Sequence, residues 1–424
     1  MRRILSVRTS FIFLLTLFII QSSIFNSFAQ LPNTWTQKAS FPGAPRTGAV
    51  AFSIGAKAYV GTGQDSSSNL LSDFWEYDPA TNLWTQLADF AGTPRRGAVG
   101  FSIGSKGYIG TGADSLGLRK DFWEYDPAGN SWTQKTSLGG SVAANARRDA
   151  ASFSTNSKGY VITGYDGSFA WNKECWEFDG DTTWIRKLDM GTSASNSQRR
   201  WATAFSIDTS GYVGCGYNYW QDWKKDFWKF SPSTNTWTQV ADFGGDARAN
   251  AIGFSIGGKG FVGTGGNTQY YNDFWQYDPS SNVWNRLADY AGGLITGGIG
   301  FSVNGSGYAG LGTDSIGYHS DLWEYTPDST IGIFDPVRHS VRVRVFPNPF
   351  SSFTTIDLET EQPVSSNELV FVLFDANGNK WREEILRKNK WRLERKNLAA
   401  GIYFYMVKKV SDHSILASGK MIIE

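Results

Sequence analysis

The sequence has few of the residues that build disulfide frameworks, metal centres and nucleophilic active sites. It contains two cysteines and three histidines in 424 residues. Two cysteines exclude a scaffold held together by disulfides. His319 is the only histidine between residues 30 and 327, and one imidazole cannot complete a Ser-His-Asp triad, a zinc motif or a copper-radical site. We therefore predict no metal, no cofactor and no catalytic residues, although paired carboxylates for glycoside hydrolysis stay open.

A charge excess of one sign is also missing. The formal net charge is +1, so the chain lacks the broad basic field that indicates nucleic-acid binding. We expect no nucleic-acid partner.

Long apolar runs are rare. The run Phe11–Ile20 is too short to span a bilayer, which takes about 20 residues. It follows Arg2 and Arg3 and precedes a small-x-small site at residues 27–29. Residues 1–29 are therefore predicted to be a cleaved signal peptide, with a membrane anchor as the alternative. We expect no membrane span after cleavage.

Aromatic residues and glycine are abundant and follow a repeat. The sequence Asp-Phe-Trp-Glu-Tyr-Asp-Pro, followed by Trp-Thr-Gln, occurs at residues 73 and 121, with variants elsewhere. Its first tryptophan recurs at Trp75, Trp123, Trp176, Trp228, Trp275 and Trp323. Its second tryptophan recurs at Trp35, Trp84, Trp132, Trp184, Trp237 and Trp284. A period of about 50 residues is typical of a propeller blade.

Each repeat divides into four predicted strands, named a to d. In the second copy these are residues 97–103, 106–112 and 121–126, with strand d opening at Trp132. Strand a carries small side chains in every copy, which suits the crowded axis of a propeller. The first repeat element is a d strand at Trp35 and the last is a c strand near Tyr325. The first strand is therefore predicted to complete the last blade, which leaves no open edge.

These features resemble the kelch-repeat family, including the propeller of galactose oxidase-like proteins. The shared features are the glycines of strand b, the Tyr-Asp-Pro of strand c and the tryptophan of strand d. The chain departs from the family where Gly-Thr-Gly replaces the double glycine. The resemblance implies an all-β fold, with a six-bladed kelch-type β-propeller of four-stranded blades over residues 30–327.

Residues 328–340 are predicted to be a linker, and residues 341–424 a separate small β-sandwich. Its segments 345–350, 374–378, 398–404 and 419–423 resemble the C-terminal sorting domain of the type IX secretion system. That resemblance implies the secretion machinery as a partner. It also implies export through the periplasm of a Gram-negative bacterium to the outside or the outer surface. An ordinary immunoglobulin-like module is the alternative. The basic run 380–396 is interpreted as a solvated face.

Three rings of polar residues are predicted on the propeller face that carries the d–a and b–c loops. The first is Arg46, Arg95, Arg147, Arg199 and Arg248, broken by Ile295. The second is Asp65, Asp114, Asp166, Asn218, Asn267 and Asp314. The third is Asp73, Asp121, Glu174, Asp226, Asp273 and Asp321. Repetition in nearly every blade favours structural roles, as turn caps and as Arg–carboxylate pairs with the next blade. An arginine ring that binds an acidic peptide is the alternative.

The candidate ligand site rests on residues that the repeat does not explain. The d–a loops that enter blades three and four span 15 positions from Trp to Arg, against 11 elsewhere. Aromatic residues outside the repeat gather in the same two blades. The predicted ligand-binding residues are Tyr165, Trp171, Trp201, Tyr217, Tyr219, Trp220 and Trp223, with Arg147 and Arg199 beneath them.

The sequence therefore predicts an exported or cell-surface binding module, expected to be a monomer, for a glycan or, second, a protein or peptide. An alternative is a carbohydrate-active enzyme of the epimerase or lyase kind on the same face. Another is a purely structural surface protein. Cys175 and Cys215 are predicted to be unbridged, because each replaces a buried repeat residue.

Overall fold

The computed structural model describes residues 33–140, 145–155, 157–167, 171–191, 197–220, 222–327, 341–360, 369–375, 380–386, 388–410 and 415–424. These residues form two compact units, one up to residue 327 and one from residue 341. The predicted signal peptide and linker lie outside the described residues. In the described part of the chain, no helix has the length and apolar character needed to cross a membrane.

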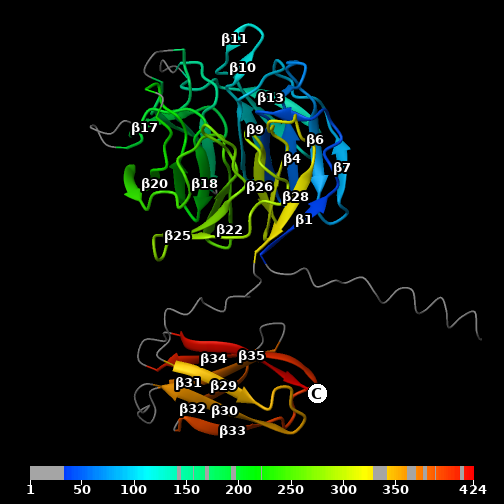
Figure 1. Cartoon of the computed structure of the whole chain (residues 1–424), viewed down its shortest axis with the longest axis vertical. Coiled ribbons are helices and arrows are strands. Elements are labelled where there is room, and N and C mark those ends of the chain that lie inside the picture. Colours follow the sequence, from blue (N-terminus) through cyan, green and yellow to red (C-terminus); the bar gives the residue numbers. More distant parts are fainter. Residues whose placement is uncertain are drawn as a thin grey trace, which may run out of the picture. The chain divides into compact units, whose positions relative to one another are not determined.

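The first unit consists of six four-stranded antiparallel sheets, as counted over the described residues (Figure 1). Their inner strands are β3 (Val50–Ile54), β8 (Val99–Ile103), β14 (Ala151–Thr155), β18 (Thr203–Ile207), β22 (Ile252–Ile256) and β26 (Ile299–Val303). Each inner strand contacts the inner strands of its two neighbours, and β26 contacts β3. The small-sided strands thus surround the propeller axis, as predicted.

The other strands follow outward in the predicted order. The second strands are β4 (Lys57–Gly61), β9 (Lys106–Gly110), β15 (Lys158–Ile162), β19 (Ser210–Gly214), β23 (Lys259–Gly263) and β27 (Ser306–Gly310). The third are β6 (Phe74–Asp78), β12 (Phe122–Asp126), β16 (Cys175–Phe178), β20 (Phe227–Ser231), β24 (Phe274–Asp278) and β28 (Leu322–Thr326). The outer strands are β7 (Leu83–Gln86), β13 (Ser131–Lys135), β17 (Trp184–Lys187), β21 (Thr236–Val240), β25 (Val283–Arg286) and β1 (Thr34–Lys38).

The last blade is closed by the first strand. Strand β1 pairs with β28, with Trp35 opposite Tyr325 (Figure 1). Trp35 also makes ring contacts with Phe274 and Tyr290 of the preceding blade, at centroid distances of 4.9 and 5.0 Å. The predicted closure is confirmed, and it gives the last blade the same outer strand that the others have.

Repeated aromatic residues pack one blade against the next. Trp132 contacts Phe74 and Phe90 of the preceding blade, and its indole N–H donates to the Ala88 carbonyl at 3.1 Å. Such aromatic pairs contribute about 0.5–1.5 kcal/mol beyond the burial of their area. Nearer the axis, the Phe52 ring lies where a β-carbon on Gly107 would stand, 2.3 Å from it. The glycine of strand b is therefore required by the phenylalanine of the preceding blade.

The second unit has two sheets around one core. One sheet contains β29 (Val341–Phe346), β30 (Phe353–Thr360) and β33 (Lys390–Glu394). The other contains β32 (Lys380–Leu386), β31 (Leu369–Asp375), β34 (Gly401–Lys409) and β35 (Ile415–Ile423). Ile356 and Leu393 from the first sheet share a buried core with Phe371 and Tyr405 from the second. The basic run forms strands β32 and β33, which were not predicted, and it includes an exposed ion pair between Lys380 and Glu383 at 2.6 Å.

Candidate functional site

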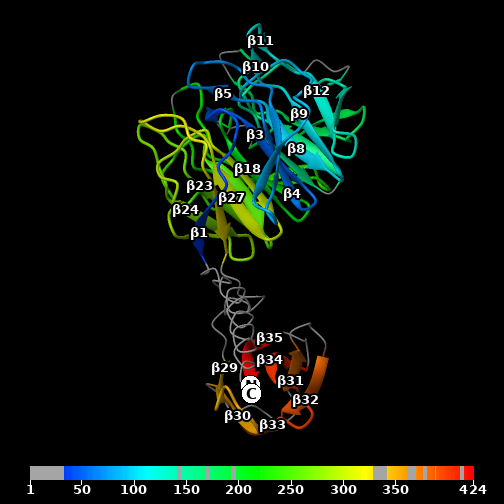
Figure 2. The same cartoon turned by 90° about the vertical axis from the view of Figure 1, so that its right-hand side faces the viewer.

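The d–a and b–c loops lie on one face of the propeller, which we call the loop face. In the first blade β2 (Arg46–Thr47), from the d–a loop, pairs with β5 (Gln64–Asp65), from the b–c loop. Equivalent bridges occur in the other five blades. Figure 2 shows β5 at the same end of the propeller as the hairpin of β10 (Ala113–Asp114) and β11 (Gly117–Leu118). The two loop types therefore form one surface.

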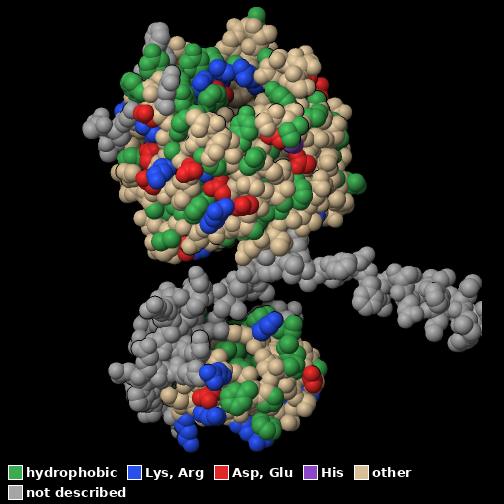
Figure 3. Space-filling model, viewed as in Figure 1, with side chains coloured by type: hydrophobic (Ala, Val, Ile, Leu, Met, Phe, Trp, Pro, Cys, Tyr) green, Lys and Arg blue, Asp and Glu red, His purple; other side chains and the backbone are tan. Residues whose placement is uncertain are grey.

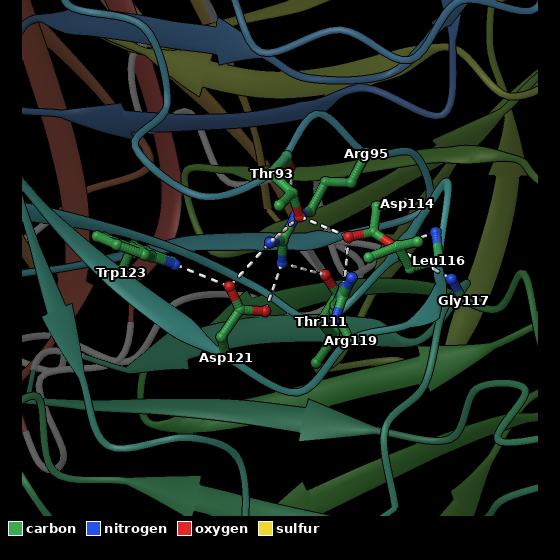
Figure 4. A network of polar contacts seen from close by, with 9 residues as sticks. All are labelled: Thr93, Arg95, Thr111, Asp114, Leu116, Gly117, Arg119, Asp121 and Trp123. Carbon is green, nitrogen blue, oxygen red and sulfur yellow. Dashed lines mark hydrogen bonds and ion pairs between the residues drawn. The ribbon is translucent and has the colours of Figure 1, made fainter.

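The ring of arginines is buried inside the blades. All five guanidinium-bearing side chains are fully buried: Arg46, Arg95, Arg147, Arg199 and Arg248. Figure 4 shows Arg95, which donates to both oxygens of Asp121 at 2.7 and 2.8 Å and to the Thr111 carbonyl at 2.9 Å. Trp123 donates its indole N–H to the same carboxylate. Each arginine thus joins the start of its blade to strand c of the same blade, whereas the sequence suggested the next blade.

This geometry corrects the prediction that Arg147 and Arg199 contact a ligand. Arg147 donates to Glu174 at 2.5 Å, and Arg199 donates to both oxygens of Asp226 at 2.8 Å. Burial alone would raise the pKa of Glu174, but hydrogen bonds from Arg147 and Trp176 and the Arg147 charge outweigh it and lower the pKa. Because these guanidinium groups are enclosed and fully paired, their role is structural.

The second polar ring caps turns on the loop face. Asp65 accepts the backbone N–H groups of Ser67 and Asn69 at 2.9 and 2.8 Å. Asp114 accepts those of Leu116 and Gly117 at 2.8 and 3.1 Å (Figure 4). These contacts agree with the structural interpretation of that ring.

The predicted aromatic residues meet in one group. We call Tyr165, Trp171, Trp201, Tyr217, Tyr219, Trp220 and Trp223 the aromatic cluster. Trp171 contacts Tyr165, Tyr217 and Tyr219 at centroid distances of 6.3, 5.6 and 6.4 Å. Tyr217 contacts Trp201 and Trp223, and Tyr219 contacts Trp220. Tyr219 and Trp220 are exposed, and the others are half-buried. The rings from blades three and four thus form a continuous surface.

A closed ring of backbone hydrogen bonds encircles the axis beneath these loops. We call its residues the collar, and they are Gly48, Gly97, Asp149, Trp201, Asn250 and Gly297. Each N–H donates to the carbonyl of the collar residue in the preceding blade, at 2.8–3.2 Å, and Gly48 donates to Gly297. All six have a left-handed backbone, with φ between 54° and 65°. Glycine adopts this conformation readily, and asparagine and aspartate do so more often than other residues, whereas Trp201 is strained in it.

A pit of about 300 Å³ opens at the collar, and Arg96, Asp149 and Trp201 are among its lining residues. Arg148 and Arg200 lie next to Asp149, with Arg148 Nε 3.6 Å from Asp149 Oδ2. Figure 3 shows Lys and Arg side chains gathered around a hollow at this end of the propeller. We call Arg96, Arg148 and Arg200 the arginine trio.

The arginine trio joins the pit to the aromatic cluster. The Arg200 guanidinium lies 3.7 Å from the Trp201 ring centroid and 4.6 Å from that of Trp171. Arg148 lies 5.4 Å from the Tyr165 ring. Burial lowers the pKa of Arg200, Asp149 opposes that effect, and Arg148 adds to it. Cations on aromatic faces next to a polar pit form a surface that suits a ligand with both a flat apolar face and a negative charge.

Two family comparisons and one structural comparison agree with this architecture. Residues 45–91 match the Kelch motif family, and residues 344–424 match the Secretion system C-terminal sorting domain family. The solved structure of YjhT is similar, with a TM-score of 0.54 and 18% identity over 67% of this chain and 96% of that one. Among curated proteins, no sequence relative is found. The chain thus combines a six-bladed propeller, whose first blade matches the Kelch motif family, with a C-terminal region that matches the sorting-domain family.

The sorting domain directs the kelch propeller out of the cell, to the medium or the cell surface, through the type IX secretion machinery. Both cysteines of the propeller are free and buried, as predicted. Burial raises the pKa of the Cys215 thiol to about 12, so it is unreactive as well as unbridged. Over the described residues, no group of three or more His, Cys, Asp or Glu side chains could hold a metal ion.

The sequence interpretation missed Asp149 and the arginine trio. Their signal was present: Arg-Arg pairs stand at 95–96, 147–148 and 199–200, whereas the other blades have Arg-Thr, Arg-Ala or Ile-Thr. The sequence interpretation considered only the first arginine of each pair, which belongs to the repeat. The second breaks the repeat in three consecutive blades.

Proposed function

We propose that this exported propeller binds an acidic saccharide on its loop face. The sugar ring lies against the aromatic cluster, and its negative group enters the pit beside the arginine trio. A sugar presents C–H groups on a flat face, which suits stacking on tryptophan and tyrosine rings. The two features of such a ligand, a flat face and a carboxylate, match the two kinds of side chain that meet here.

The observation that carries the proposal is the contact between Arg200 and the rings of Trp171 and Trp201. The Arg200 charge lies so close to the two tryptophan rings, at 3.7 and 4.6 Å from their centroids, that one sugar residue can contact both the charge and a ring. Arg96 lines the pit, and Arg148 and Arg200 lie beside Asp149, so three guanidinium groups against one carboxyl group make the surroundings of the pit positively charged. That charge favours an acidic saccharide over a neutral one.

Backbone strain at two residues of the cluster supports a role in binding. Trp171 and Trp201 have φ of 40° and 57°, a conformation that costs of order 1–3 kcal/mol for a residue of this kind. Glycine stands at the Trp201 position in three other blades, so the fold itself does not require a tryptophan there. Strain of this kind is typical of sites where function selects the side chain.

A panel of acidic and neutral oligosaccharides, applied to the full-length protein, tests the proposal. We expect binding of uronate-containing oligosaccharides, and at least tenfold loss in Trp171→Ala and Trp223→Ala. Tyr270→Ala is the matched control, since Tyr270 is an exposed aromatic residue of blade five outside the cluster. Equal loss in the control, binding of a peptide but no saccharide, or turnover of a bound sugar would contradict the proposal. The last result would favour a carbohydrate-active enzyme.

A further inference from the structure

Asp149 contributes its backbone, but not its carboxyl group, to the collar. Its side chain is 9% exposed, and Oδ2 has no hydrogen-bond partner among the described residues. Its part in the collar is made by the main chain, since its N–H donates to Gly97 and its carbonyl accepts from Trp201, at 2.8 and 2.9 Å. Glycine or asparagine makes the same bonds in four other blades. The collar therefore does not need this carboxyl group.

The surroundings of Asp149 are built to hold a charged side chain. The charged groups that face it are Arg148 of its own blade, Arg96 of blade two and Arg200 of blade four. Trp201 contributes a hydrogen bond. Gly97 provides the space that the Asp149 carboxyl group occupies, because a β-carbon on Gly97 would stand 2.3 Å from Asp149 Oδ1. The carboxyl group is thus enclosed within the pit, among the guanidinium groups that the proposed ligand needs.

A ligand carboxylate and the Asp149 carboxylate would compete for the same guanidinium groups. Two like charges a few ångströms apart raise each other's pKa until one of them takes up a proton. Burial already raises the pKa of Asp149, and the three arginines only partly offset it. A proton on Asp149 Oδ2, which has no hydrogen-bond partner among the described residues and lies 3.6 Å from Arg148 Nε, relieves this repulsion.

We propose that Asp149 couples ligand binding to proton uptake, an inference that rests on the proposed function. The affinity of the pit for acidic saccharides therefore rises as the pH falls. One proton passes from solvent to Asp149 as the anion enters, and it returns to solvent when the anion leaves. No other bond forms or breaks. The neutral carboxyl group then donates its O–H to the ligand, and the arginine trio faces the ligand charge alone.

Calorimetric titration of the full-length protein with trigalacturonate, between pH 5.5 and 8 in buffers of different ionisation enthalpy, tests this inference. We expect up to one proton to be taken up for each ligand bound. In the upper part of the range, the affinity should fall by up to tenfold per pH unit, the limit for a single coupled group. A neutral trisaccharide that binds should show no proton uptake.

The matched variant is Asp149→Asn, which keeps the size of the side chain and removes its titration. It should bind trigalacturonate without proton uptake, and at pH 8 at least as tightly as the unmodified protein does. Asp149→Gly is a second variant that relieves the left-handed backbone, so a folding defect in the first does not decide the result. Ligand binding without proton uptake, or uptake that persists in both variants, overturns this inference and leaves the proposed function standing. Failure of trigalacturonate to bind at any pH overturns both.

Discussion

Two sets of arginines occupy adjacent positions in the sequence but differ in their surroundings, in their partners and in the number of blades that carry them. Arg95 is fully buried and holds Asp121 in a bidentate pair. Arg96, the next residue, lines the pit. The buried set recurs in five blades, whereas the arginine trio occurs in three adjacent blades only. A residue that recurs around the propeller stabilises each blade in the same way. A residue that breaks the repeat instead changes the chemistry of one part of the surface.

Blade six shows what the buried set does, because it lacks its arginine. Ile295 takes that position and is buried. Asp321 still accepts a hydrogen bond from the indole N–H of Trp323, but its Oδ1 has no hydrogen-bond partner among the described residues. His319 lies nearby, with Nδ1 3.8 Å from that oxygen. The blade still forms, since its packing and the closing strand β1 remain.

The largest expected effect is on stability, from Arg95→Ala. The change removes the positive partner of the Asp121 carboxylate, which keeps the Trp123 indole N–H, and removes the guanidinium donor to the Thr111 carbonyl. We expect the free energy of unfolding to fall by about 3 kcal/mol or more, measured by urea denaturation followed by tryptophan fluorescence. Arg96→Ala is the control and should change it by less than about 1 kcal/mol. Equal losses in the two variants would remove the distinction between the two sets.

The next effect is on stability in acid. Burial would raise the pKa values of Asp121 and Asp226, but hydrogen bonds and charge from Arg95 and Arg199 lower them below the usual range. Their contribution to stability is thus complete above the unfolded pKa of about 4 and is lost as the pH falls through the folded values. We expect a Tm that is flat from pH 7 to 5 and falls below about pH 4. Asp121→Asn should weaken that fall, and a main transition near pH 6 would contradict it.

A smaller effect, on binding alone, is expected from Arg200→Gln. Loss of one guanidinium group beside the ligand charge should weaken binding of an acidic oligosaccharide by about tenfold or more, which corresponds to about 1.4 kcal/mol. The Tm should stay within a few degrees. Arg286→Gln is the control, because Arg286 is an exposed arginine on an outer strand of blade five. Equal weakening in both variants would point to a general charge effect.

The smallest effect on stability is expected from Trp201→Gly. The change removes ring contacts but relieves a left-handed backbone, so the unfolding free energy should change by about 1 kcal/mol or less. Ligand affinity should fall. Trp132→Ala, at a repeat position packed between blades, should instead cost about 3–5 kcal/mol. A stability loss at Trp201 as large as that at Trp132 would show that the collar depends on its side chain.

Much of the aromatic cluster was predictable, because Trp171, Trp220 and Trp223 stand outside the repeat and in the two blades with longer loops. The role of Arg147 and Arg199 was not, because a sequence does not show which of two adjacent arginines points inward. Asp149 was also missed. Its importance comes from arginines of the blades on either side of it, which are about 50 positions away in the chain.

The sequence by itself determined the propeller, its six blades and the closing strand, because each blade repeats the local pattern of small, aromatic and turn residues that its strands need. It also determined the sorting domain, through short segments in a fixed order. Only the tertiary structure decided where the pit lies and which charges face it. Side chains from three blades meet there around a ring of backbone hydrogen bonds, and that meeting depends on the closure of the whole circle.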